Sequence, residues 1–255
     1  MDYAVLAGDA RMPALAALLR ERGSDARYIA NADAAEALIP KARNIVTHCP
    51  PRLGMEMERV LELASQDARV YICGPKAHPG DARVIDLWAD KALKVENARL
   101  TAEGAVSAAM AAGRRSLKDL PTLVVGWGRI GRALTELLVA MGARVMVASR
   151  SLEHRHRAIQ RGAEAVSLEK LNGWLPGMAL VFSTAPAMVL DAPRLQWLDR
   201  SAMVIDLASP PYGVDLPAAW QLGLRAWREP GLPGRYCPES AAEALLNAME
   251  RGNGI

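Results

Sequence analysis

This sequence has few cysteines, few lysines and little net charge, and the first and last of these each exclude a class of protein. Its three cysteines (Cys49, Cys73 and Cys237) are widely spaced and form no C-x-x-C pattern. That spacing argues against a disulfide framework and a structural zinc, and is typical of a reducing cytoplasm. Only six of the 31 basic residues are Lys, a skew that we attribute to codon usage because 28 acidic residues nearly balance them. The net charge of +3 lacks the basic excess expected of a protein that binds nucleic acid or an anionic membrane.

Long apolar runs are also missing, so no segment is expected to span a membrane. Residues 3–7 already have the pattern of a buried strand, with no basic segment leading into an apolar core, and we therefore predict a cytoplasmic location. The histidines show no metal-ligand spacing, so no metal site is predicted; they are His48, His78, His154 and His156.

A glycine-rich turn follows the apolar run 123–125 and leads into a helical pattern. The order of strand, G-x-G-x-x-G and helix is the one that a dinucleotide-binding unit needs. Gly126 allows the tight turn, Gly128 lets the backbone approach a pyrophosphate, and Gly131 lets the helix pack on its strand. The amide groups of Arg129 and Ile130 would face the phosphates at the positive end of the helix. The sequence therefore predicts a bound dinucleotide here.

Short apolar runs alternate with helical patterns along the whole chain, which predicts an α/β protein with parallel sheets. We expect two domains: a smaller N-terminal α/β substrate domain at residues 1–100 and a Rossmann-type, doubly wound cofactor domain at 117–237. A linking helix is predicted at 101–116, with Thr101 as its N-cap and Glu103 near its positive end. The last helix, 238–251, is expected to pack back on the first domain.

The second strand of the cofactor domain is followed by Ser149, Arg150 and Ser151, where an NAD-preferring unit usually has an acid. Arg150 could pair with the 2′-phosphate of NADP, helped by the two serine hydroxyls. The alternative is an exposed Arg after a strand. The missing acid favours NADP as the cofactor.

Two further segments follow strands that should end at the same crevice, where the nicotinamide half is expected. They are Thr184-Ala185-Pro186 and Ala208-Ser209. Ordinary proline-marked loops are the alternative for either segment.

Asp9 and Arg11 leave the first strand together, and Arg is well suited to binding a carboxylate with two parallel hydrogen bonds. The alternatives are that Asp9 only caps the next helix and that Arg11 is a solvated charge. Glu103 is a candidate general base or only a favourable charge in a first helical turn. The loops 48–51 and 73–76 also follow strand ends and are candidate substrate contacts.

Several motifs together resemble the first of the two subunits of dipicolinate synthase. In chain order they are Gly8–Arg11, Thr101–Gly104, the glycine turn, Ala148–Ser151, Ile205–Ser209, Pro230–Gly234 and the helix that begins at Pro238. The resemblance is densest from Thr101 to Met249. One departure is Pro210–Gly213, which places Tyr212 where the family has no side chain.

The resemblance implies an NADP-dependent dehydrogenase that converts dihydrodipicolinate, a small cyclic dicarboxylate, to dipicolinate in the mother cell of a sporulating bacterium. It also implies a partner, the flavoprotein-like second subunit of dipicolinate synthase. Arg11 would bind the substrate carboxylates with Asp9 orienting it, and the backbone after Thr101 would close the site. We expect Glu103 to accept the proton, with water as the alternative. The sequence does not determine the oligomeric state, and a homo-oligomer stays open.

Two other functions stay open. A D-2-hydroxyacid dehydrogenase has a similar layout but needs a His paired with an acid late in the cofactor domain, and no His follows His156. An NADP-sensing regulatory protein without catalysis would explain the lack of an obvious acid–base pair.

Overall fold

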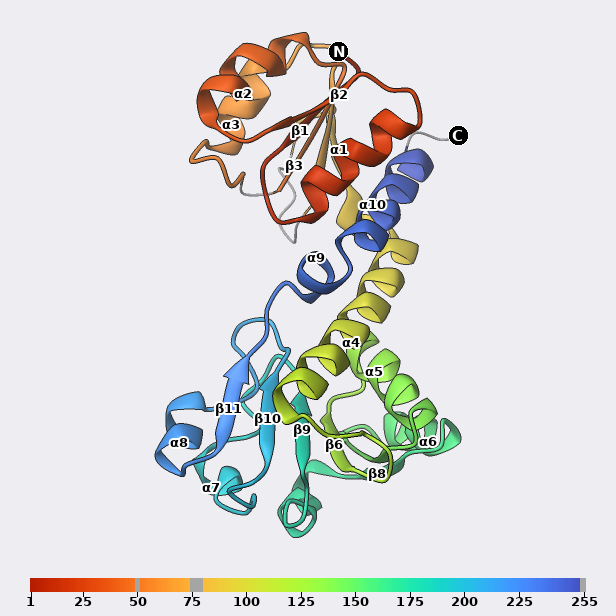
Figure 1. Ribbon diagram of the computed structural model, residues 1–255, viewed down its shortest axis with the longest axis vertical. Coiled ribbons are helices and arrows are strands. Elements are labelled where there is room, and N and C mark those ends of the chain that lie inside the picture. The colour runs from red at the N-terminus through yellow and green to blue at the C-terminus, as the bar shows by residue number, and fades with distance from the viewer. Residues whose placement is uncertain (49–50, 74–79, 253–255) are drawn as a thin grey trace. The chain divides into compact units, whose positions relative to one another are not determined.

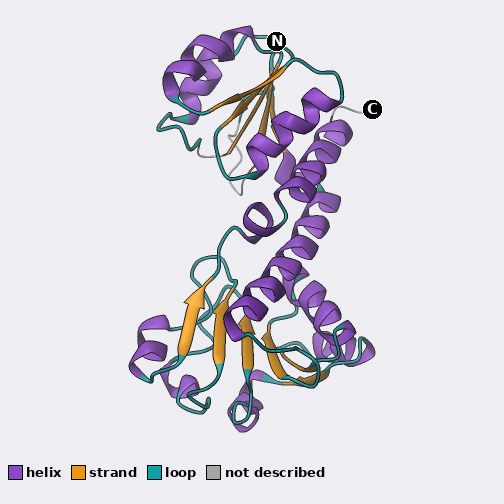
Figure 2. Ribbon diagram, viewed as in Figure 1, coloured by secondary structure: helices purple, strands orange, loops and turns teal. Residues whose placement is uncertain are grey.

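Two parallel sheets, each with helices on both faces, organise the chain (Figures 1 and 2). The computed structural model describes residues 1–48, 51–73 and 80–252. The chain divides into a first unit, residues 1–100 with 233–255, and a second unit, residues 101–232. The predicted α/β class with two Rossmann-like sheets is confirmed.

The first unit contains a five-stranded sheet in the order β2-β1-β3-β4-β5, with all pairs parallel. This is a doubly wound order, and the chain reverses direction across the sheet between β1 and β3. Its elements are β1 (Tyr3–Leu6), α1 (Arg11–Glu21), β2 (Ala26–Ile29), α2 (Ala32–Leu38), η1 (Ile39–Lys41), β3 (Asn44–His48), α3 (Met57–Leu63), β4 (Arg69–Cys73), β5 (Val84–Asp86), η2 (Leu87–Ala89) and α10 (Pro238–Gly252).

Alternate residues of the first sheet supply two cores. Val5 and Val46 pack with α1 and α10, whereas Ala4, Leu6 and Ile45 pack with α2 and α3. Figure 1 shows these two helix pairs on opposite sides of the sheet. The last helix thus completes the core of the first unit, because its apolar residues Leu245 and Met249 are buried there.

The second unit contains six parallel strands in the order β11-β10-β9-β6-β7-β8, the dinucleotide-binding order of a Rossmann fold. Its switch point lies between β6 and β9. The elements are β6 (Pro121–Val125), α5 (Arg129–Ala140), β7 (Arg144–Ala148), α6 (Leu152–Gln160), β8 (Glu164–Val166), η3 (Leu168–Trp174), β9 (Leu180–Ser183), α7 (Ala192–Leu195), β10 (Met203–Asp206), α8 (Leu216–Gln221) and β11 (Arg225–Arg228).

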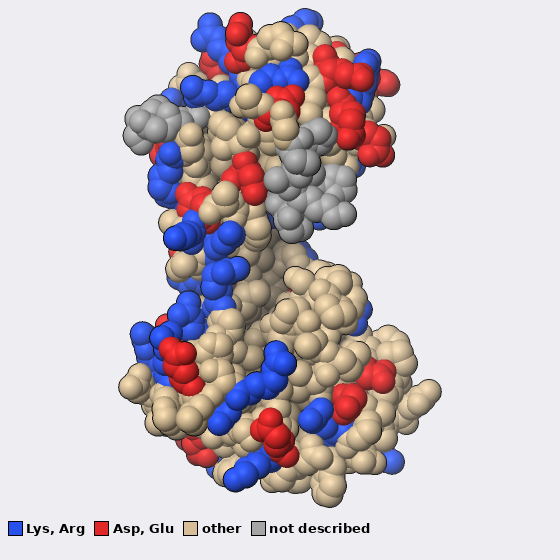
Figure 3. Space-filling model, turned by 180° about the vertical axis from the view of Figure 1, so that it is seen from behind, with Lys and Arg blue, Asp and Glu red and all other residues tan. Residues whose placement is uncertain are grey.

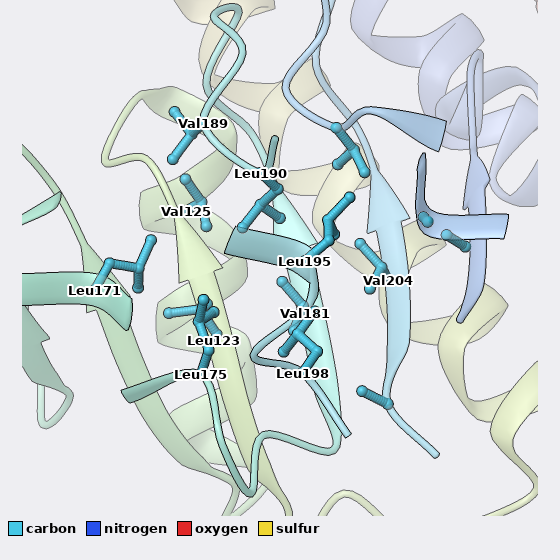
Figure 4. Packing of buried hydrophobic residues seen from close by; sticks show 14 of the residues in the cluster. Leu123, Val125, Leu171, Leu175, Val181, Val189, Leu190, Leu195, Leu198 and Val204 are labelled. Carbon is cyan, nitrogen blue, oxygen red and sulfur yellow. The ribbon is translucent and has the colours of Figure 1, made fainter. Parts of the chain in front are cut away.

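The second sheet also alternates its buried residues between two faces. Leu123, Val181 and Val204 pack against η3, α7 and α8, as Figure 4 shows from close by. Val124 and Phe182 face the opposite core with residues of α5 and α6. Burial on both faces explains why these strands read as continuous apolar runs in the sequence.

Two helices cross the boundary between the units: α4 (Lys91–Gly113) and α9 (Leu232–Tyr236). The expected helix start at Thr101 was wrong, because α4 begins ten residues earlier, at Lys91. Thr101 is therefore not the N-cap of this helix, and Glu103 is far from the helix N-terminus, where the positive dipole end is concentrated. The strands β5 and β8 have only three residues each, too few to stand out as apolar runs in the sequence.

Basic and acidic side chains are interspersed on the face drawn in Figure 3. In the parts of the chain that the structure describes, no helix is both long and apolar enough to cross a membrane.

Candidate functional site

The glycine turn joins β6 to α5, and its three glycines have different surroundings. Gly126 has φ +105°, and a Cβ there would lie 2.6 Å from Thr184 Oγ1. A Cβ on Gly131 would lie 2.3 Å from the carbonyl oxygen of Gly126, so the helix packs directly on the turn. Gly128 is the N-cap of α5, and no atom lies within 4 Å of where its Cβ would be. Gly126 and Gly131 therefore have no room for a side chain, whereas there is space beside Gly128.

A cavity of about 510 Å³ lies beside this turn, at the carboxyl ends of β6, β7 and β9. Among the cofactor residues expected from the sequence, its walls include Gly126, Gly128, Ser149, Arg150, Ser151, Thr184, Ala185 and Pro186. Arg129 lies beside a smaller hollow of about 250 Å³ with Trp127 and Gly128. Ile130 is in the first turn of α5, and its N–H is one of those that a helix cannot satisfy internally.

The loop after β7 presents Arg150 at this cavity. Arg155 donates from one guanidinium nitrogen to the carbonyl oxygens of Ser149 and Arg150, at 2.8 Å each, which holds the loop in place. Ser151 caps α6, because its Oγ accepts from the N–H of His154 at 3.2 Å. Arg150 itself is exposed, and none of the described carboxylates lies within ion-pair distance of it.

Arg194 is a residue that sequence reasoning missed at the same cavity. It follows the N-cap Asp191 of α7 and donates from NH1 to the carbonyl oxygen of Val189 at 3.0 Å. Its Nε is buried and has no hydrogen-bond partner among the described residues. Only the folded cavity reveals this cation, because Asp-Ala-Pro-Arg reads as an ordinary helix start.

Ala208 and Ser209 follow β10, outside the walls of the 510 Å³ cavity. The fully buried carboxylate of Asp206 shapes this loop: it accepts from the N–H of Ala208 at 3.1 Å and from that of Gly213 at 3.2 Å. Tyr212, at φ +68°, lies under the guanidinium of Arg228 with 3.5 Å between the guanidinium carbon and the ring centroid. Arg228 Nε is 3.6 Å from Asp206 Oδ2.

In the first unit, Asp9 and Arg11 lie after β1, at the point where the strand order reverses. Arg11 donates from Nε to Asp9 Oδ1 at 2.8 Å and from a terminal nitrogen to Oδ2 at 2.7 Å. Burial acts to raise the pKa of Asp9, but the hydrogen bonds and charge of Arg11, with a smaller effect of His48, hold that pKa below its usual range. Among the described residues, three of the five guanidinium N–H groups of Arg11 have no acceptor.

His48, at the end of β3, was expected only as part of the loop 48–51, a candidate substrate contact, and not as a catalytic residue. Its ring is buried, with Nδ1 2.9 Å from the carbonyl oxygen of Cys73 and Nε2 3.7 Å from Asp9 Oδ2. Gly8 makes room for it, since a Cβ there would lie 2.2 Å from the ring. No local sequence pattern identifies His48 as a candidate base, because Asp9 and Cys73 are brought next to it only when the strands pair in the sheet.

The structure says less about the other residues that we expected to contact the substrate. Thr101 is buried and Glu103 is half-buried within α4, and both belong to the second unit. The loop candidates 48–51 and 73–76 fall in part on residues 49–50 and 74–76, which lie outside the described residues.

The chain's own residues fit a dinucleotide in the second unit. The open space at Gly128 would admit a pyrophosphate close to the backbone, and the first N–H groups of α5 point out of the helix as donors. Two cations, Arg150 and Arg194, are among the residues that line the cavity. In the first unit, Arg11 could bind a carboxylate.

Comparison with known proteins agrees with this geometry. Residues 91–208 match the family described as "D-isomer specific 2-hydroxyacid dehydrogenase, NAD binding domain". This match supports a nicotinamide cofactor and an NAD(P)-dependent oxidoreductase.

The chain is also similar to the first subunit of dipicolinate synthase from Bacillus subtilis (strain 168), with 27% identity over 169 residues. The aligned region is 66% of this chain and only 57% of that relative, less than two thirds of its length. The crystal structure of the corresponding subunit from Bacillus halodurans has a TM-score of 0.80 at 22% identity, covering 98% of this chain and 96% of that one. The Bacillus subtilis structure gives 0.79 at 21% identity, covering 98% and 95%. The resemblance seen in the motifs is thus confirmed, and so is the two-domain fold.

Proposed function

We propose that this protein is an NADP-dependent dehydrogenase that oxidises dihydrodipicolinate to dipicolinate (pyridine-2,6-dicarboxylate). The observation that carries the proposal is the sequence likeness to the first subunit of dipicolinate synthase, since the fold alone is common to many dehydrogenases. The protein would act with a flavoprotein-like second subunit in the cytoplasm of the mother cell of a sporulating bacterium.

The first unit would bind the substrate. Arg11 has N–H donors to spare, and its ion pair with Asp9 fixes the plane of its guanidinium. A carboxylate bound to those donors gains charge-assisted hydrogen bonds in a partly buried site, where they are stronger than in water. Arg11 would therefore orient the ring through one carboxylate.

The second unit would bind the cofactor. The glycine turn and the first N–H groups of α5 would hold the pyrophosphate, while Arg150 and Arg194 would pair with a 2′-phosphate. When bound, the oxidised nicotinamide accepts a hydride from the substrate. The segments Thr184–Pro186 and Ala208–Ser209 would border the nicotinamide half.

A turnover assay tests this function. The chain is incubated with NADP⁺ and freshly made dihydrodipicolinate, with and without the flavoprotein-like second subunit, while NADPH and dipicolinate are measured together. We expect turnover that the second subunit increases. If neither product forms even when both proteins are present, the reaction is wrong, and a non-catalytic NADP-sensing role would then be favoured if NADPH still binds.

A second candidate is an NADP-dependent dehydrogenase of another small carboxylate, such as a 2-hydroxy acid. The family match over residues 91–208 favours it. The same assay with a panel of 2-hydroxy acids separates the two, because dihydrodipicolinate should give the higher kcat/KM under our proposal.

A further inference from the structure

We propose that His48 is the proton acceptor of the first unit's site, a role that rests on the proposed dehydrogenation. Sequence reasoning had favoured Glu103 for this step. His48 lies at the end of β3 and Asp9 just after β1, the two strands between which the sheet order reverses. In doubly wound sheets, ligands bind in the crevice at this point.

The hydrogen bonding of His48 determines which of its nitrogens is basic. The carbonyl oxygen of Cys73, 2.9 Å from Nδ1, can only accept a hydrogen bond, so Nδ1 carries the hydrogen. In the neutral ring the lone pair is then on Nε2. This atom is buried and has no hydrogen-bond partner among the described residues. A buried acceptor without a donor is rare in folded proteins, and a ligand that brings a proton would satisfy it.

The surrounding charges suit a base that is neutral at rest. Burial is the main cause that lowers the pKa of His48, and the cations Arg11 and Arg52 lower it further. Asp9, 3.7 Å from Nε2, acts in the opposite direction. Cys73, the other titratable neighbour among the described residues, keeps its proton because burial raises the pKa of its thiol to about 12. His48 is therefore unprotonated near neutral pH, and Asp9 stabilises the imidazolium that forms when Nε2 takes a proton.

The proposed oxidation removes one proton and one hydride from dihydrodipicolinate, with the oxidised nicotinamide dinucleotide as the oxidant. One C–H bond of the dihydropyridine ring breaks and its proton goes to Nε2, while the electron pair stays to form the new ring double bond. A hydride leaves the neighbouring ring carbon with its electron pair for the oxidised nicotinamide dinucleotide. The ring becomes aromatic, and His48 releases its proton to solvent after the product leaves.

The first test is the pH profile of kcat/KM, measured with the second subunit present. The wild-type rate should fall on the acidic side with a midpoint below about 6.5, the ordinary His pKa. His48→Gln should lower kcat/KM by about 10²- to 10⁴-fold and remove that acidic limb, because a general base usually contributes that much. His156→Gln, on the exposed face of α6, should change neither. A circular dichroism spectrum and a urea unfolding transition like those of the wild type show whether His48→Gln is folded, and His48→Asn is a second variant.

The second test needs no turnover: ¹⁵N NMR of the imidazoles of the wild-type protein. The chain has only four histidines, so single His→Gln variants assign the signals. We expect His48 to carry its hydrogen on Nδ1 and to shift when dipicolinate is added. A hydrogen on Nε2 would overturn the proposal. So would an active enzyme whose acidic limb survives in His48→Gln, with the dehydrogenase function left standing. If the wild-type enzyme together with the second subunit leaves dihydrodipicolinate unchanged, the proposed function itself fails, and the role of His48 with it.

Discussion

The proposed function predicts that the wild-type protein binds NADPH more tightly than NADH, and that replacing Arg150 or Arg194 makes the two affinities nearly equal. Both side chains border the cavity of the second unit, and only NADPH carries a 2′-phosphate for them to bind. A hydrogen bond to a charged group contributes about 1.5–3 kcal/mol. Arg150 is exposed, so we expect the lower end, about a tenfold loss of NADPH affinity in Arg150→Ala. Arg194 has a buried Nε, so Arg194→Met should lose more, up to about a hundredfold.

The assay is a fluorescence titration with each nucleotide, which gives the ratio of the two dissociation constants for every variant. NADH affinity serves as the internal reference, since the phosphate contact is absent from it. Arg200→Ala is the matched control, because this exposed Arg precedes the amino end of β10, whereas the cavity lies at the carboxyl ends of the strands. If Arg150→Ala keeps the wild-type ratio, Arg150 is only a surface charge. If Arg194→Met weakens the binding of NADPH and NADH equally, Arg194 only supports the loop, through its hydrogen bond to the carbonyl oxygen of Val189.

Four other outcomes are expected. Arg11→Ala should lower kcat/KM at least tenfold, about 1.4 kcal/mol, without changing NADPH affinity, whereas Arg27→Ala, at an exposed position of β2, should be neutral. A parallel loss of NADPH affinity in Arg11→Ala would contradict substrate binding in the first unit. Gly131→Ala should abolish tight NADPH binding because its Cβ would lie 2.3 Å from a carbonyl oxygen, while Gly173→Ala, with nothing within 4 Å, should not. The free energy of unfolding should fall as the pH is lowered from 7 to 5, because the pKa of His48 is lower in the folded protein and the unfolded chain therefore binds the proton first. His48 contributes at most about 1.4 kcal/mol per pH unit to this fall. Urea denaturation of His48→Gln should show a smaller change in the free energy of unfolding per pH unit. The chain alone should turn over poorly, and full activity without the flavoprotein-like second subunit would argue against the partner.

The second unit could be predicted well from sequence because its signals are local. Strand, glycine turn and helix occupy consecutive residues from Leu123 onward, and each buried strand is a continuous apolar run. β8 was missed because it has three residues and Glu164 is exposed. The start of α4 was misplaced because Thr101 resembles an N-cap, although the helical chain already begins at Lys91.

The site of the first unit depends on contacts that a sequence does not display. Asp9 and Arg11 are two residues apart, and their pairing could be anticipated as one of two alternatives. His48 joins them only because β1 and β3 are neighbours in the sheet. Its tautomer depends on a carbonyl group 25 residues further along the chain. Tertiary placement, rather than residue type, makes it a candidate base.

The most direct test of the proposed dehydrogenation is a single-turnover experiment with the enzyme and the second subunit in excess over dihydrodipicolinate, in the presence of NADP⁺. Dipicolinate and NADPH are quantified from the same quenched samples. We expect the two to appear at the same rate and in equal amounts. Dipicolinate that forms without NADPH, or at the rate of a control without enzyme, would contradict hydride transfer by this protein.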